Sequence, residues 1–162
     1  MTNFEGQLVA IYVSPVRSAP MQHIESVVAE AGCGLVGDRN HRAGARGRAK
    51  PRGEVTLIES EAVAAAVADY GLTFDASSSR RNLVTVGVPL NHLVGRVFRV
   101  GSTVLRGIEL CEPCSHLEKL TVRGIEEALR HRGGLRAQIL EGGTLAVGNT
   151  IRLCDVTEHG IE

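Results

Sequence analysis

The stretch RVFRVGSTVLRGIEL, residues 96–110, is the clearest indication of the fold in this sequence. Two runs rich in Val, Leu, Ile and Phe, at 96–100 and 103–110, are separated only by Gly101 and Ser102. Branched and aromatic side chains favour β-strands, and a two-residue connection that contains glycine is typical of a β-hairpin. The stretch therefore predicts two antiparallel strands joined by a tight turn.

Further strand-like runs lie on both sides of this hairpin. They occupy residues 6–13, 26–29, 54–58, 81–86, 135–140, 144–147 and 150–153, and glycine pairs or Gly-Asn separate the last three. Glycines at 32, 34 and 37 interrupt the chain after the second run. Consecutive strands with few intervening helices favour a mostly antiparallel sheet, which we expect to curl into a barrel.

Two segments have helical character instead. Residues 59–70 (ESEAVAAAVADY) are rich in alanine and end before Gly71. A second helix is expected over 121–131, where Thr121 can cap the N-terminus and Val122, Ile125 and Leu129 share one face. The predicted fold class is therefore mainly β with a few helices. No repeat or linker divides the chain, so we expect residues 1–162 to form one domain.

The balance of charges restricts the possible partners. The chain carries 18 basic and 18 acidic residues, and this zero net charge argues against a general nucleic-acid or membrane-surface binder. Only Lys50 and Lys119 are lysines, so the remaining basic residues are arginines. Arginine grips phosphate or carboxylate groups through two parallel hydrogen bonds. The composition thus fits an anionic small-molecule ligand, although a GC-rich genome would also favour arginine.

The cysteines are best interpreted for a reducing compartment. The N-terminal residues run directly into a strand pattern without a signal peptide, and no apolar run approaches the roughly 18 residues of a membrane-spanning helix. We therefore expect a cytoplasmic protein in which Cys33, Cys111, Cys114 and Cys154 stay reduced. Packing, ligand or reactive thiols are then more plausible than disulfides.

The segment Cys111-Glu-Pro-Cys114 is the first candidate for chemistry. It follows a predicted strand and leads into a short helical stretch, where backbone N–H groups can stabilise a thiolate, and Cys114 is better placed for this than Cys111. Three other interpretations stay open: two packed small side chains, half of a zinc site completed by His116, His41 or Cys33, or a thioredoxin-like redox pair. The histidines at 41, 92 and 116 are by themselves expected to be surface or hydrogen-bonded residues and not ligands.

Three basic or polar clusters could bind an anion. Residues 38–53 (DRNHRAGARGRAKPRG) contain almost no apolar side chains, so we expect a long exposed loop that clamps a phosphorylated ligand or is merely solvated. Arg80-Arg81-Asn82 begin a predicted strand and could hold a phosphate or a heterocycle edge. Gly37-Asp38 is a turn, or a carboxylate that orients a neighbouring arginine.

Six segments in order give the chain a family resemblance. They are GLVGDRN at 34–40, EVTLIE at 54–59, RRNLVTVGVPLNHLVGRVFRVG at 80–101, LCEPCSHLE at 110–118, RGGLRAQIL at 132–140 and GGTLAVGNTI at 142–151. With these segments the sequence resembles the MOSC domain, named after the C-terminal part of molybdenum cofactor sulfurase, and in particular its short stand-alone bacterial members. The resemblance implies a mixed β-barrel of the pyruvate-kinase-like type.

The resemblance also implies a site. A cysteine that carries sulfur or coordinates molybdenum maps onto Cys114, and the residues implied to line the molybdenum cofactor site are Gly37, Asp38, Arg81 and Asn82. Arg39, Arg80 and Arg136 are assigned to phosphate or pterin contacts on charge and nearness to the motifs. Pyridoxal phosphate comes only by family association, because no segment of this chain supports a Schiff-base lysine.

Three functions follow as hypotheses. The chain binds the pyranopterin molybdenum cofactor with Cys114 as metal ligand and reduces N-hydroxylated compounds with electrons from a separate electron-transfer protein. Alternatively, Cys114 accepts persulfide sulfur from a cysteine desulfurase and delivers it to a metal-sulfur cofactor. A third hypothesis is an interaction module whose basic loop binds nucleic acid or an acidic partner, against which the scarcity of aromatic residues speaks.

Overall fold

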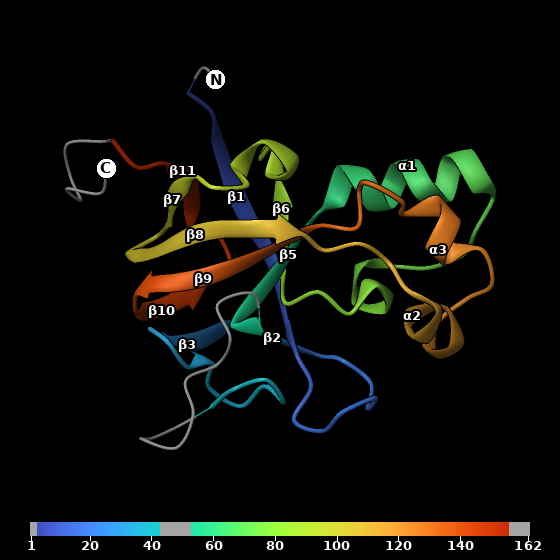
Figure 1. Cartoon of the computed structure of the whole chain (residues 1–162), viewed down its shortest axis with the longest axis horizontal. Helices are drawn as coiled ribbons and strands as arrows, with labels where there is room; N and C mark the ends of the chain where they lie inside the picture. Colours follow the sequence, from blue (N-terminus) through green and yellow to red (C-terminus); the bar gives the residue numbers. More distant parts are fainter. Residues whose placement is uncertain (1–2, 43–52, 156–162) are drawn as a thin grey trace.

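A closed β-barrel forms the body of the molecule in the computed structural model, which describes residues 3–42 and 53–155 (Figure 1). Eight strands pair in the order β11, β7, β8, β9, β5, β6, β1, β2, and β11 also pairs with β1, so that seven of them close into a ring. The strands are β1 (Glu5–Val13), β2 (Gln22–Ile24), β5 (Val55–Glu59), β6 (Leu83–Val86), β7 (Val97–Val100), β8 (Thr103–Leu110), β9 (Leu135–Glu141) and β11 (Thr150–Leu153).

The predicted hairpin is confirmed. Strands β7 and β8 run antiparallel, with Val97 opposite Arg106 and Val100 opposite Thr103. All other pairs of the ring are antiparallel except β5 with β6, which run parallel because helix α1 (Ser60–Tyr70) crosses over between them. The barrel is therefore mostly antiparallel, as the strand pattern predicted, and mixed, as the family resemblance implied.

A separate small sheet lies beside the barrel and was not predicted. It consists of β10 (Gly143–Ala146), β3 (Ser26–Glu30) and the two-residue strand β4 (Gly34–Leu35). The glycine-rich break after β3 thus contains a short strand, and β2 and β4 are both too short to leave a pattern in the sequence. The register of β10 on β3 places Gly143 opposite Ala29.

Two apolar clusters hold the fold together. The larger fills the barrel and includes Leu8, Leu57, Leu83, Phe98 and Leu105, all without exposed surface. Burying each such side chain contributes about 1.5–3 kcal/mol. The smaller cluster lies between the barrel wall and the helices and comprises Ile58, Val63, Ala66, Val84, Leu117, Ile125, Ala128 and Leu129. It fixes the three helices on one side of the barrel (Figure 1).

The first helix is confirmed and the second prediction is partly wrong. Helix α1 ends at Gly71, which has the left-handed φ of 62°. The expected helix over 121–131 is replaced by α2 (Ser115–Leu120) and α3 (Ile125–Ala128). The backbone of Thr121 leaves the helical region (φ −126°, ψ −100°) and ends α2, its hydroxyl donates to the carbonyl oxygen of Leu117, and Gly124 at φ 95° starts α3. Ile125 and Leu129 are nevertheless buried as their spacing predicted.

Smaller differences concern the ends of elements and the basic loop. The strand predicted over 81–86 begins only at Leu83, and the side chains of Arg81 and Asn82 just before it bind other segments. Of the loop predicted over 38–53, residues 43–52 lie outside the described residues. Within the part of the chain that is described, no helix is long and apolar enough to cross a membrane.

Candidate functional site

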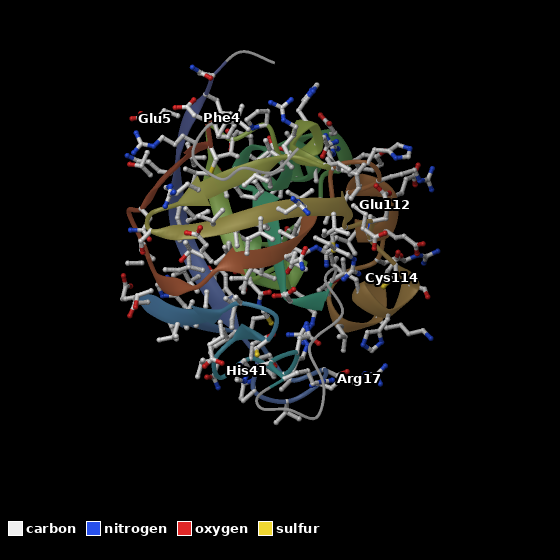
Figure 2. All side chains as sticks on the ribbon, turned by 60° about the vertical axis from the view of Figure 1, so that its left-hand side comes forward. Phe4, Glu5, Arg17, His41, Glu112 and Cys114 are labelled. Atoms are coloured by element: carbon white, nitrogen blue, oxygen red, sulfur yellow. The ribbon has the colours of Figure 1, made fainter. Side chains whose placement is uncertain are left out.

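An arginine-rich pocket of about 500 Å³ opens at one end of the barrel. Five segments that are distant in sequence meet there: the β1–β2 connection, the residues after β4, the start of β6, the start of α2, and β9. Its lining consists of Arg17, Ser18, Arg39, Asn40, Arg42, Arg80, Arg81, Cys114, His116, Leu117 and Arg136. Figure 2 shows Cys114 and Arg17 on the side of the molecule away from Phe4 and Glu5.

The thiol of Cys114 is exposed in this pocket, whereas that of Cys111 is buried. Cys114 is the residue that precedes α2, and its extended backbone (φ −138°, ψ 168°) turns the chain into the helix. Cys111 is anchored by its backbone N–H, which donates to Gly134 at 2.7 Å. A methyl group at Gly133 would lie 2.5 Å from the carbonyl oxygen of Cys111, so the segment that carries Cys114 packs directly on a glycine.

Arg81 forms the buried floor of the pocket. Its side chain donates to three backbone carbonyls, those of Gly133 (2.8 Å), Ser79 (3.1 Å) and Cys111 (3.0 Å). Burial lowers the pKa of Arg81, opposed by the neighbouring thiols of Cys111 and Cys114. A buried guanidinium is normally balanced by a carboxylate. Among the described residues, however, no acidic side chain lines this pocket.

Arg80 occupies the neighbouring wall in a strained backbone conformation. Its φ of 62° is in the left-handed region, which side chains other than glycine rarely adopt, and its Nη1 donates to the carbonyl oxygen of Ala19 at 2.7 Å. Partial burial lowers the pKa of Arg80, and the positive charge of Arg39 adds to this effect. The carboxylate of Asp38, which lies 3.4 Å from Arg39 Nη1, opposes both effects on the pKa of Arg80.

Asp38 shapes the loop behind the arginines. Its carboxylate accepts from the backbone N–H of Ser14 (3.0 Å) and of Asn40 (3.3 Å), and Arg39 Nη1 lies 3.4 Å away. Gly37 precedes it at φ 90°, which explains why glycine occurs at this turn. Asp38 is buried, and these contacts join the end of β1 to the segment that carries Arg39.

Asn82 braces three strands of the barrel wall. Its Oδ1 accepts from the backbone N–H and the hydroxyl of Thr56, each at 3.1 Å, and its Nδ2 donates to the carbonyl oxygen of Tyr12 at 3.1 Å. Asn82 is buried, and both polar atoms of its side chain form hydrogen bonds with residues of β5 and β1. Its contribution to the pocket is to hold the strand start from which Arg80 and Arg81 project.

Comparison with known protein families shows the family of this chain. The family model of the MOSC domain matches residues 44–152. The chain belongs to the MOSC domain family. No curated protein matches the sequence.

Solved structures share the architecture of this MOSC domain. The YuaD protein from Bacillus subtilis superposes with a TM-score of 0.79 at 15% identity, over 95% of this chain and 99% of the other. YiiM from Geobacillus stearothermophilus gives 0.71 at 15% identity, over 97% and 79% of the two chains. YiiM from Escherichia coli gives 0.67 at 15% identity, over 96% and 71%. These likenesses establish the shared fold, including the mixed barrel.

The MOSC domain brings together five of the eight residues predicted for the site. The lining of the pocket contains Cys114, Arg39, Arg80, Arg81 and Arg136. Gly37, Asp38 and Asn82 are not among the lining residues and instead position the segments that carry them. The sequence thus pointed to segments that meet at one pocket, but it did not separate the side chains that face the pocket from those that support it.

Three further residues of the MOSC pocket were missed or undervalued. Arg17 lies in the β1–β2 connection, where the sequence shows only a turn after Pro15. Arg42 belongs to the basic loop but was not singled out. His116 was expected to be a surface or hydrogen-bonded residue, and it lines the pocket with its Nε2 3.3 Å from the hydroxyl of Ser18. A signal for His116 existed in its position two residues after Cys114.

The described residues offer no further ligands that would complete a zinc site at the cysteine pair. In the described ranges, no group of three or more His, Cys, Asp or Glu side chains is arranged to hold a metal ion. Cys114 therefore offers a single soft ligand in a basic pocket. Such a donor set suits a metal that arrives with ligands of its own on an anionic carrier. The residues present fit the molybdenum cofactor that is associated with the MOSC family.

Proposed function

We propose that this MOSC domain binds the molybdenum cofactor in the arginine-rich pocket, with the thiolate of Cys114 holding the metal. The observation that carries the proposal is the buried guanidinium of Arg81, which lies beside the exposed Cys114 with no carboxylate in the described lining. The ligand would supply the missing negative charge. Arg81 is held by three carbonyls before any ligand arrives, so its charge costs no reorganisation on binding.

The remaining arginines would hold the anionic part of the cofactor. Arg80 precedes β6 and Arg136 lies in β9, and both line the pocket together with Arg81. Arg136 Nε is 3.7 Å from Glu109, an ion pair at the rim that leaves part of its guanidinium for the ligand. Arginine forms two parallel hydrogen bonds with a phosphate, which orients the ligand as well as attracting it.

The reaction that fits is the reduction of N-hydroxylated compounds. When bound, the cofactor would supply the two-electron chemistry of molybdenum, while the protein orients it and shields its charge. Electrons would come from a separate electron-transfer protein. The exposed position of Cys114 leaves the pocket open to solvent and to a small substrate. A ligand thiol that stays reduced matches a cytoplasmic protein.

The experiment is to isolate the protein from a host that makes the cofactor and from one that does not. Elemental analysis and pterin fluorescence should then find molybdenum and pterin together in the first preparation and neither in the second. A first preparation that contains neither would refute the proposal. Added molybdate without pterin should not replace the cofactor, because the pocket offers only one thiol.

A sulfur carrier is the second candidate, favoured by the exposure of Cys114. The thiolate would attack the terminal sulfur of a persulfide on a cysteine desulfurase, forming a new S–S bond at Cys114 while the donor cysteine leaves as a thiolate. Incubation with a desulfurase and cysteine should then increase the mass of the chain by one sulfur at Cys114. The metal content separates the candidates, since a carrier holds sulfur without molybdenum.

A further inference from the structure

A smaller hollow of about 220 Å³ adjoins the arginine-rich pocket. The two cavities share Ser18 and Arg80, so Arg80 stands in the wall between them. The hollow is lined by Ser18, Pro20, Met21, Ser77, Ser78, Arg80, Leu120 and Thr121. Its volume equals the space of about seven waters in the liquid, which suits one small ring system. We refer to it as the serine pocket.

The hydroxyl groups of Ser77 and Thr121 in the serine pocket already donate hydrogen bonds within the protein. The hydroxyl of Ser77 donates to the carboxylate of Asp75, and that of Thr121 donates to the carbonyl oxygen of Leu117 at 2.7 Å. Ser78 makes a longer contact to Asp75 at 3.4 Å. The hydrogen bond from Ser77 holds the pKa of Asp75 below its usual value, so this group is an ionised acceptor. A hydroxyl has one proton and two lone pairs. The oxygens of Ser77 and Thr121 can therefore only accept further hydrogen bonds.

Arg80 contributes hydrogen-bond donors to the serine pocket. One of its N–H groups is used by Ala19, and the fork has donors left for a ligand. Its left-handed backbone closes the short helix over Ala76–Ser79, and Arg80 lines the same cavity as Ser77 and Ser78. Pro20, Met21 and Leu120 supply apolar surface. The serine pocket thus combines apolar walls, hydroxyl acceptors and a charged donor.

We propose that the serine pocket takes the aminopyrimidinone edge of a heterocycle whose anionic remainder lies in the arginine-rich pocket. An aminopyrimidinone carries an amino group and a ring N–H as donors beside a carbonyl acceptor. The donors match the oxygens of Ser77 and Thr121, and the carbonyl matches Arg80. This inference rests on the proposed function. The ring system is either the pterin of the cofactor or a guanine base attached to the cofactor.

Binding of free heterocycles tests the inference. The protein from a host without cofactor synthesis is titrated with pterin (2-amino-4-oxopteridine) and with lumazine, in which an oxo group replaces the 2-amino group, and ring fluorescence is followed. We expect pterin to bind at least about tenfold more tightly, because lumazine places an acceptor against hydroxyl oxygens. Guanosine monophosphate, measured by competition, distinguishes the guanine source from the pterin source.

The matched variants are the double substitution Ser77→Ala with Thr121→Val and, as a control, Ser60→Ala outside both pockets. The double variant should reduce the preference for pterin over lumazine to below about threefold, while the control keeps it. Thermal unfolding verifies that both variants are folded. If the variant Thr121→Val is needed alone because the double variant unfolds, it should halve the preference at least.

Failure of this inference can be distinguished from failure of the proposed function. If the wild-type protein binds neither pterin nor guanosine monophosphate more tightly than lumazine, or if the folded double variant keeps the full preference, the serine pocket is not the heterocycle site. Molybdenum loading in a cofactor-competent host would then still stand on its own. A clear preference without any molybdenum loading would instead leave the serine pocket assigned and refute Cys114 as metal ligand.

Discussion

The guanidinium of Arg81 donates to the carbonyl oxygen of Cys111 at 3.0 Å and thereby ties the floor of the pocket to the segment that carries Cys114. Through Gly133 and Ser79 the same side chain also reaches the residues before β9 and the short helix over Ala76–Ser79. One buried cation therefore organises three segments around the thiol. The stability of the fold and the binding of an anion depend on the same residue.

Replacing Arg81 by methionine should destabilise the protein strongly. Three carbonyl oxygens would lose their donor in a buried place, and we expect the free energy of unfolding to fall by about 3 kcal/mol. Arg80→Met is the matched control, because Arg80 is only partly buried and binds a single carbonyl, and it should cost about 1 kcal/mol. Urea unfolding gives both values. Equal costs for the two variants would mean that Arg81 does not brace the site.

Asn82→Ala should affect stability far more than binding. It removes partners from Thr56 and Tyr12 in the barrel wall, which we expect to cost about 2 kcal/mol in urea unfolding. Since Asn82 does not line the pocket, the folded variant should keep its molybdenum content. A variant of unchanged stability that has lost the metal would show instead that Asn82 touches the cofactor directly.

Gly133→Ala should displace the cysteine segment. The added methyl group would lie 2.5 Å from the carbonyl oxygen of Cys111 and 3.0 Å from Cδ of Pro113, so this segment must move. We expect a cost of about 1–3 kcal/mol and reduced molybdenum loading. Gly53→Ala is the control, because a methyl group there meets nothing within 4 Å. If both variants load alike, the position of Cys114 tolerates a shift of its segment.

Glu54 should make stability depend on pH. Burial raises its pKa above the usual 4.5, and Oε2 has no hydrogen-bond partner among the described residues. The folded state therefore binds the proton more tightly than the unfolded state. Its contribution to stability is most favourable below pH 4.5 and is lost as the pH rises through the raised pKa. Glu54→Gln should flatten this part of the profile of unfolding free energy against pH, and a profile identical to that of the wild type would contradict the assignment.

Local patterns predicted the barrel because its strands are joined in sequence. The run over 96–110 specified its own hairpin, and Gly71 marked the end of α1. The boundary between α2 and α3 could not be predicted, since it depends on the non-helical backbone of Thr121 and on the left-handed Gly124. Both features lie within a few residues of the boundary, but the helical spacing of the apolar residues does not reveal them.

The site was predictable only in part because it is assembled by distant segments. Cys114 and Arg81 were found through motifs, whereas Arg17 enters from the β1–β2 connection, a placement that only the closed barrel determines. Asn82 is the converse case, since this polar residue beside two arginines was predicted to line the cofactor site, and its side chain binds Thr56 and Tyr12 in the barrel wall. Sequence patterns identify polar residues but do not indicate which face of the wall they point to.

The most direct measurement is the molybdenum content of Cys114→Ser and Cys111→Ser purified from a cofactor-competent host, with the wild type beside them. We predict about one molybdenum per wild-type chain, a loss of at least about tenfold in Cys114→Ser, and nearly full loading in Cys111→Ser, because a single exposed thiolate would hold the metal. Cys114→Ser protein that is folded and still carries molybdenum at the wild-type ratio would contradict the account.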